Sequence, residues 1–313
     1  MTILYTHDDC LEHNPGEGHP ERPARLKAIL AALDKPEFAG LDRREAPFAE
    51  RAHLEFVHPA YFVETVLALA PAHGHAMLDG DTVMSPGSDR AALRAAGAVV
   101  AAVAAVCDGE AKTAFCAVRP PGHHAEPEQA MGFCLFNSIA VGAAVAQASH
   151  AVERVAIVDF DVHHGNGTEA MAETRPGWLY ASTHQWPLYP GSGANRHRGP
   201  HGNIVNATLS PGAGSAEFRG AFEERILPAL DAFRPELLMI SAGFDAHRRD
   251  PLAGLELETE DFAWVTRALV EVAARHCGGR IVSTLEGGYD LAALADSTAA
   301  HVRVLMESEA GSG

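Results

Sequence analysis

The sequence is poor in basic residues, with 24 Lys and Arg against 41 Asp and Glu in a chain of 313 residues. Its formal net charge is −17 at pH 7. An acidic surface repels the phosphate backbone, which argues against a nucleic-acid-binding protein. The charge would mildly attract cationic substrates, but many soluble proteins are equally acidic and it identifies no ligand.

Cysteine is also scarce, and no C-x-x-C pair occurs. An odd number of cysteines, without the regular spacing of a disulfide framework, argues against a disulfide-stabilised secreted protein and predicts reduced thiols. The N-terminus, MTILYTHDDC, lacks the basic and apolar regions of a signal peptide. We therefore expect a cytoplasmic protein. The five cysteines are Cys10, Cys107, Cys116, Cys134 and Cys277.

Long apolar runs, internal repeats and flexible linkers are missing as well. The stretch 91–106 is rich in Ala, contains Arg94 and looks too short to span a membrane, so we expect a packed helix and no membrane partner. With 47% hydrophobic residues, the chain can bury one large core. We predict a single domain over residues 1–313.

Short β-rich runs alternate with longer helical patterns, which predicts an α/β fold. In this three-layer fold, a mostly parallel central sheet is covered by helices on both faces. Pro23 suits a first helical turn, and Ser88 and Thr259 suit N-caps. The predicted strands are 2–6, 113–118, 153–159, 178–183, 236–241 and 280–285. The predicted helices are 23–33, 60–70, 88–106, 136–149, 216–231, 259–275 and 291–305.

Polar clusters follow four of the predicted strands. In open α/β sheets, ligands bind beyond the carboxyl ends of the strands, so one shared crevice would explain all four clusters. They are CAVRPPGHHAE (116–126), VDFDVHHGNGT (158–168), SAGFDAH (241–247) and TLEGGYD (284–290).

The second cluster predicts a metal site. Side chains alternate faces along a strand, so Asp159, Asp161 and His163 should point the same way, with the two apolar residues between them facing the core. Asp245, at another strand end, is the best third ligand. Three ligands with an open position are typical of catalytic zinc. The alternative interpretation is a buried ion-pair network that caps the following turn.

Adjacent histidines in the first cluster, His123 and His124, suit proton transfer near neutral pH. Asp159 could keep one imidazole charged, and Asn166 could hold the other while leaving it less basic. A histidine pair is otherwise often only structural.

The fourth cluster places Tyr289 after a Gly-Gly turn, where its hydroxyl could donate a hydrogen bond to an oxyanion. Taken alone, Tyr289 is better explained as a core tyrosine.

With these clusters in place, the chain resembles the histone deacetylase family, class II more than class I, with the arginase–deacetylase fold. The matching motifs run in family order over nearly the whole chain. They are GHPERPARL (18–26), RPPGHHAE (119–126), GFCLFNSIAVGA (132–143), VDFDVHHGNGT (158–168), YPGSG (189–193), SAGFDAH (241–247), DPLAGL (250–255) and LEGGYDL (285–291).

The resemblance implies a role for each matching position. Asp161, His163 and Asp245 would bind zinc. His124 would be the general base and His123 its electrostatic partner, with Asp159 and Asn166 behind them and Tyr289 polarising the amide carbonyl. The implied tunnel for the acyl-lysine side chain is Gly132, Phe133, Tyr189 and Leu252.

The resemblance also implies a potassium ion held by Asp159, the backbone oxygens of Asp161 and His163, and the Ser182 hydroxyl. A second potassium site known in the family matches poorly here and is not assigned. The segment 194–209 departs from the family pattern, which leaves the conformation of the loop 194–203 open. Ferrous iron would also accept the zinc ligands.

The implied reaction is the hydrolysis of N-ε-acetyl-lysine in proteins or peptides. An acetylpolyamine amidohydrolase is the main alternative, although one polyamine-selective branch carries glutamate where this chain has Leu252. A two-metal ureohydrolase is less expected, because Gly165 and His247 stand where it needs further carboxylates. A non-catalytic acyl-lysine binding module should have lost a catalytic residue. The physiological substrate and the oligomeric state are not predicted.

Overall fold

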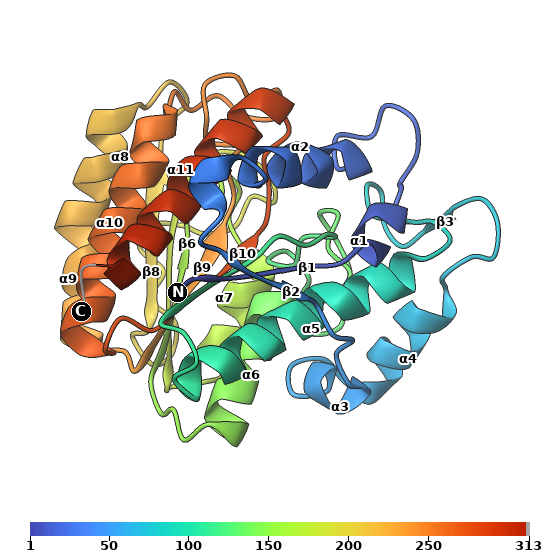
Figure 1. The fold of residues 1–313 in the computed structure, drawn as a ribbon, viewed down its shortest axis with the longest axis horizontal. Coiled ribbons are helices and arrows are strands. Elements are labelled where there is room, and N and C mark those ends of the chain that lie inside the picture. Colours follow the sequence, from blue (N-terminus) through green and yellow to red (C-terminus); the bar gives the residue numbers. More distant parts are fainter. Residues whose placement is uncertain (311–313) are drawn as a thin grey trace.

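An eight-stranded sheet forms the centre of the protein in the computed structural model, which describes residues 1–310 (Figure 1). Its strands pair in the order β2-β1-β5-β10-β9-β6-β7-β8, and every pair is parallel. The bounds are β1 Ile3–Thr6, β2 Asp42–Glu45, β5 Thr113–Cys116, β6 Val155–Asp159, β7 Trp178–Gln185, β8 Ile204–Leu209, β9 Leu237–Ala242 and β10 Ile281–Leu285. A short hairpin, β3 Ala76–Met77 and β4 Val83–Met84, lies outside this sheet.

Helices cover both faces of the sheet, as predicted (Figure 1). One face is covered by α5 Ser88–Cys107, α6 Ser138–Ser149 and α7 Asn166–Glu173. The other is covered by α2 Pro23–Leu33, α8 Ser215–Ala221, α9 Leu227–Phe233, α10 Thr259–His276 and α11 Leu291–Ala310. The smaller helices are α1 Asp9–Glu12, α3 Arg51–Leu54 and α4 Ala60–Ala68, with the 3₁₀ turn η1 Pro36–Phe38 and the π turn η2 Phe222–Ile226.

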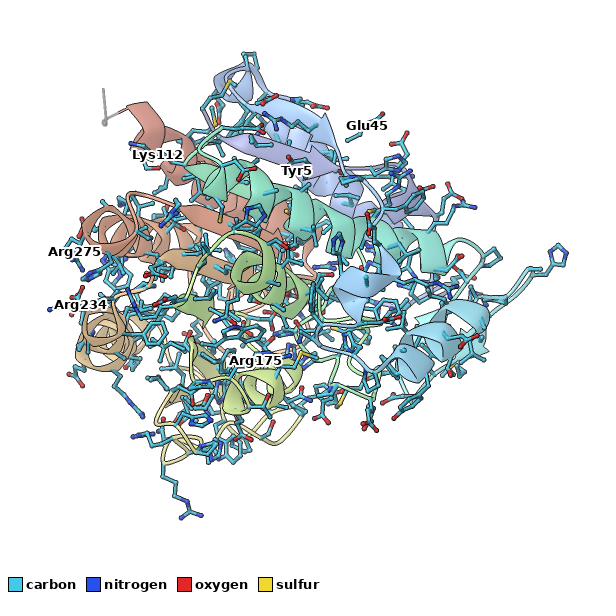
Figure 2. The ribbon with its side chains drawn as sticks, turned by 90° about the horizontal axis from the view of Figure 1, so that it is seen from below. Tyr5, Glu45, Lys112, Arg175, Arg234 and Arg275 are labelled. Atoms are coloured by element: carbon cyan, nitrogen blue, oxygen red, sulfur yellow. The ribbon has the colours of Figure 1, made fainter. Side chains whose placement is uncertain are left out.

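The interior strands are apolar and buried on both sides, as expected for a parallel sheet between helices. Figure 2 shows labelled charged side chains, among them Arg234 and Arg275, at the periphery of the fold. The predicted single domain, 1–313, remains a prediction, and its last three residues lie outside the described part of the chain.

Two strands of the sheet are missing from the sequence prediction. The edge strand β2 reads DRRE, and only its pairing with β1 makes these charged residues a strand. The opposite edge strand, β8, reads IVNATL and is interrupted by polar residues. Both strands form because a partner satisfies their backbone groups, which the sequence pattern does not reveal.

Three details of the predicted helices need correction. Ser88 and Thr259 are first helical residues rather than N-caps, because the helices are capped by Gly87 and Glu258. The apolar helix α5 has 20 residues, so the argument that this stretch is too short for a membrane span was wrong. By length and composition α5 could cross a membrane, but 61% of its apolar window is buried inside the protein, as in a core helix.

Candidate metal centre and active site

The four polar clusters follow four neighbouring strands. In the sheet, β5, β10, β9 and β6 lie side by side and run parallel, so their carboxyl ends meet at one edge. The shared crevice that the sequence predicted is therefore a consequence of the strand order.

Three potential metal ligands converge at this edge. His163 Nδ1 lies 3.1 Å from Asp161 Oδ1 and 3.1 Å from Asp245 Oδ2. One ligand atom from each residue falls within 4.8 Å of the others, and all three residues are buried. The predicted alternation of side chains along one strand does not extend to all three residues, because β6 ends at Asp159 and Asp161 and His163 lie in the loop that follows it.

Backbone N–H groups fix the orientation of both carboxylates. Asp161 Oδ2 accepts a hydrogen bond of 2.7 Å from the Gly287 N–H. Asp245 Oδ1 accepts one of 2.8 Å from the Val162 N–H, and this leaves its Oδ2 facing His163. Two oriented carboxylate oxygens and an imidazole nitrogen fit Zn²⁺ or Fe²⁺.

The electrostatics of this cluster favour a cation. Burial lowers the pKa of His163, but the carboxylates of Asp161 and Asp245 outweigh it and raise that pKa to about 10. A proton or a metal cation between the three ligands would satisfy the same pair of negative charges. Metal binding requires the neutral imidazole and therefore displaces the proton.

The histidine pair has the partners that the sequence suggested. His123 Nδ1 lies 2.9 Å from Asp159 Oδ2, and His124 Nδ1 lies 2.8 Å from Asn166 Oδ1. Both imidazoles are buried, with their ring centroids 4.0 Å apart. A carboxylate thus orients one ring and an amide orients the other.

These surroundings separate the basicities of the two rings. Burial lowers the pKa of His123, but the charges of Asp159 and Asp161 oppose it and raise that pKa to about 10. Burial, followed by the positive charges of His123 and His163, holds the pKa of His124 well below its usual value. His123 is therefore charged and His124 neutral at pH 7, as acid–base catalysis by a pair requires.

A cavity of about 240 Å³ leads to these groups. His124, His163 and Tyr289 line it, so a bound substrate would meet all three. Gly132 must be glycine, because a Cβ there would lie 2.5 Å from the His124 ring and its φ is +57°. The lining includes all four predicted tunnel residues, Gly132, Phe133, Tyr189 and Leu252.

A second metal would need a carboxylate at position 165, and there is no room for a carboxylate side chain there. A Cβ on Gly165 would lie 2.3 Å from Asp159 Oδ2 and 2.7 Å from the Tyr180 hydroxyl. His247, at the other such position, hydrogen-bonds its own loop through the Arg249 N–H. These contacts argue against a two-metal ureohydrolase.

The site also uses buried residues to which the sequence analysis gave no role. Asp250 accepts hydrogen bonds from the N–H groups of Tyr289, at 2.6 Å, and Leu252, at 3.0 Å. Arg25 donates to the carbonyl oxygens of Gly288 and Glu286. Asp250 and Arg25 both lie inside the matched motifs, and this was the only sign in the sequence that they belong to the site. Their hydrogen-bond partners are distant in sequence, so the sequence did not reveal their roles.

His164, the remaining ionisable residue of the second cluster, points away from the metal ligands. Its Nδ1 lies 2.8 Å from Ser192 Oγ and its Nε2 lies 2.9 Å from Glu169 Oε2. Because Ser192 follows Tyr189 in the same loop, His164 ties that loop to α7.

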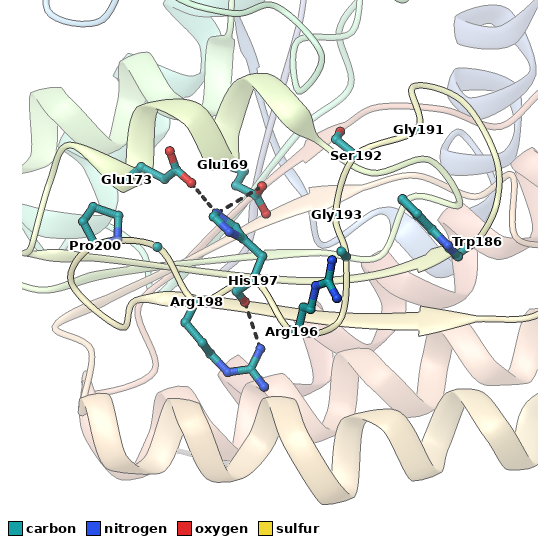
Figure 3. Close-up of a pocket in the computed structure, with 12 residues that line it drawn as sticks. Glu169, Glu173, Trp186, Gly191, Ser192, Gly193, Arg196, His197, Arg198 and Pro200 are labelled. Carbon is teal, nitrogen blue, oxygen red and sulfur yellow. Dashed lines mark hydrogen bonds and ion pairs between the residues drawn. The ribbon is translucent and has the colours of Figure 1, made fainter.

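A larger cavity, of about 840 Å³, lies beside α7 and contains none of the predicted site residues (Figure 3). Glu169, Glu173 and His197 meet there; Glu173 and His197 are only half-buried, whereas Glu169 is 9% exposed. His197 Nε2 pairs closely with Glu173 and lies 3.8 Å from Glu169 Oε1. Part of the wall is the loop 194–203, in which the Asn203 amide donates to three carbonyl oxygens.

Comparison with known proteins agrees with this geometry. The histone deacetylase domain matches residues 19–305. The histone deacetylase-like amidohydrolase of Pseudomonas aeruginosa is 43% identical over 87% of this chain and 73% of its own length. The chloroplastic histone deacetylase 10 of Oryza sativa subsp. japonica is 38% identical over 97% of this chain and 73% of its own. The crystal structure of the HDA15 HD domain matches with a TM-score of 0.93 and 37% identity, covering 98% of this chain and 88% of that one.

Proposed function

Because this chain belongs to the histone deacetylase family and is a hydrolase of amide bonds, we propose that it is a zinc-dependent deacetylase of N-ε-acetyl-lysine in proteins or peptides. One observation carries the proposal: a cavity reaches His163, which lies against Asp161 and Asp245 in the ligand set, and its wall also holds a neutral imidazole and a phenol.

The residues around the cavity supply the steps of hydrolysis. A divalent metal bound there would polarise the acyl carbonyl and make water more acidic. His124 accepts a proton from the attacking water, for which its neutral state is required. The Tyr289 hydroxyl donates a hydrogen bond to the developing oxyanion. His124 or charged His123 then protonates the departing amine, which leaves poorly without a proton.

The lining of the cavity favours a largely apolar side chain. Phe133 and Tyr189 present aromatic walls, and Leu252 adds an apolar one. The four-carbon stem of acetyl-lysine suits such a lining, because burial of its methylene groups contributes about 0.8 kcal/mol each.

We also propose a potassium site next to the zinc ligands. Asp159 and Ser182 are paired residues on the neighbouring strands β6 and β7. Both are fully buried, and the Ser182 hydroxyl meets His184 Nδ1 at 2.9 Å. Oxygen ligands of this kind suit a hard monovalent cation, whose charge would offset the buried Asp159.

An acetylated polyamine is the second candidate substrate, and one observation favours it. Asp81 lines the cavity together with Leu252, so its carboxylate could attract a second ammonium group of the substrate. Leucine at position 252 cannot form such a pair, which supports acetyl-lysine.

The test is a comparison of kcat/KM on an acetyl-lysine peptide and on acetylspermidine, with bound metal quantified. We expect the peptide to be preferred, and Leu252→Glu to shift the ratio towards acetylspermidine. Activity should disappear with a chelator and return with Zn²⁺. Undiminished turnover by metal-free protein would exclude the proposed chemistry.

A further inference from the structure

Glu286 has a buried carboxylate beside the active site that takes no part in the proposed mechanism. It follows β10 directly and is 1% exposed. Its Oε2 accepts hydrogen bonds from the N–H groups of Gly122, at 2.6 Å, and His123, at 3.1 Å. Its Oε1 accepts one of 3.1 Å from the Ser241 hydroxyl.

These three bonds join the ends of three neighbouring strands. Gly122 and His123 belong to the loop after β5, and Ser241 lies in β9, four residues before the ligand Asp245. Glu286 itself lies three residues before Tyr289. One carboxylate therefore links the loops that carry the histidine pair, one metal ligand and the phenol.

The contacts with Gly122 and His123 matter most, because they hold the backbone from which both imidazoles project. A general base must lie within hydrogen-bond reach of the proton it removes, and a misplacement of about 1 Å can cost about 100-fold in rate. Asp159 and Asn166 orient the rings, and the Asn166 amide also donates to the His124 carbonyl oxygen at 3.4 Å, but neither residue accepts the N–H groups of Gly122 and His123.

We propose that Glu286 is a positioning residue, which sets the histidine pair against Tyr289 and the metal ligands by accepting the two backbone N–H groups. This inference rests on the proposed function. The positioning depends on where the acceptor oxygen of Glu286 lies rather than on the charge of its carboxyl group. Burial raises the pKa of Glu286 to about 7. Protonation at Oε1 would leave Oε2 free to accept both N–H groups.

Two conservative variants separate position from charge. Glu286→Gln keeps the length of the side chain and an acceptor oxygen but removes the charge, and its amide can donate to Ser241. Glu286→Asp keeps the acid but draws it back by one methylene. We expect Glu286→Gln to retain kcat within about 3-fold, and Glu286→Asp to lower kcat about 10- to 100-fold with KM nearly unchanged.

The matched control is Asp261→Ala, at the start of α10. Like Glu286, Asp261 is a buried carboxylate that accepts hydrogen bonds from a backbone N–H group, that of Glu258, and from a serine hydroxyl, that of Ser215. The kcat of this variant per metal-loaded enzyme should stay at the wild-type value even if its melting temperature falls. A wild-type kcat for Glu286→Asp, or a greater loss for Glu286→Gln than for Glu286→Asp, would overturn the proposal.

Hydrogen exchange gives a readout that is independent of catalysis. Amide exchange in the segment 119–126 should accelerate in Glu286→Asp and remain at the wild-type rate in Glu286→Gln. If the wild-type protein deacetylated no substrate, the proposed function would fail, while exchange in this segment would still test the contacts. Unchanged exchange in Glu286→Asp would refute them.

Discussion

Two groups of side chains in this protein offer the same kinds of ligand atom but have very different surroundings. Asp161, His163 and Asp245 meet at the carboxyl edge of the sheet, and Glu169, Glu173 and His197 meet beside α7. Each group offers two carboxylates and one imidazole, with ligand atoms within 4.8 Å of one another. The second group lies in a cavity of about 840 Å³, against about 240 Å³ for the first.

The groups differ in what holds the carboxylates. In the first, backbone N–H groups fix Asp161 and Asp245 while leaving oxygens turned towards His163. In the second, Glu173 and His197 are half-exposed and contact each other through the His197 Nε2 and a Glu173 carboxylate oxygen. Neither the composition nor the size of a cavity identifies a catalytic centre, because burial and fixed orientation are what prepare ligands for a metal.

The largest expected contrast is in metal binding. Asp245→Asn should weaken zinc binding by more than about 100-fold, because even the partners behind metal ligands contribute about 10- to 100-fold. Deacetylation should fall with it. Glu173→Gln, the matched change in the second group, should leave both unchanged. Metal analysis after dialysis and steady-state assays would measure this.

Equal loss of metal from both variants would break the contrast. It would mean that the second group also holds an ion, and that a metal replaces the contact between Glu173 and His197 on loading. Retention of full zinc by Asp245→Asn would instead remove Asp245 from the ligand set.

The next effect concerns catalysis without a change in metal content. Tyr289→Phe removes only the hydroxyl from the wall of the smaller cavity. We expect kcat to fall about 10²- to 10³-fold, or roughly 3–4 kcal/mol, because one oxyanion donor is lost. Zinc content should remain normal, and Tyr61→Phe, at an exposed tyrosine of α4, should have no effect. Activity within a few-fold of wild type would exclude the oxyanion role.

Much of this picture was predictable from the sequence. The parallel sheet, both helical layers, the deacetylase family and the shared crevice were all predicted and are confirmed. All of the predicted site residues except Ser182 were predicted as members of short motifs, and the structure brings the residues of these motifs together at one edge of the sheet. Their catalytic roles remain predictions, as does the cytoplasmic location.

What the sequence did not reveal depends on contacts between distant segments. The edge strand β2 consists of charged residues and exists only by pairing with β1. Glu286 lies in a quoted motif, but its partner His123 is 163 positions away. A residue pattern shows which face of a strand is apolar and where a turn occurs. The role of a residue such as Glu286 depends instead on which loops lie next to each other, and the order of the strands in the sheet determines this.

A smaller effect concerns an imidazole without a carboxylate partner. Burial lowers the pKa of His301 to about 3, where it lies between Thr266 Oγ1 and Ser283 Oγ at 2.7 and 2.9 Å. Below about pH 6.5 the unfolded chain binds a proton that the folded protein does not. The free energy of unfolding should therefore fall by about 1.4 kcal/mol per pH unit between about pH 6.5 and 3 from this residue alone.

Urea unfolding at pH 7 and 5.5 would measure this loss. Because buried His184 and His58 also have lowered pKa values, of about 3 and 4, the wild-type slope should exceed that of one histidine. His301→Gln should reduce the loss between these pH values by about 1.4 kcal/mol. An unchanged slope would show that His301 is protonated in the folded protein.

The smallest expected effect is in the second group itself. The side chains of Glu173 and His197 are 34% and 42% exposed, so solvent screens their attraction. A double-mutant cycle with Glu173→Gln and His197→Gln should give a coupling free energy below about 1 kcal/mol, decreasing with salt. A salt-independent coupling above about 2 kcal/mol would mean that Glu173 and His197 are held as firmly as the buried ligands. The difference between the two groups would then rest on the burial of the site rather than on the orientation of its side chains.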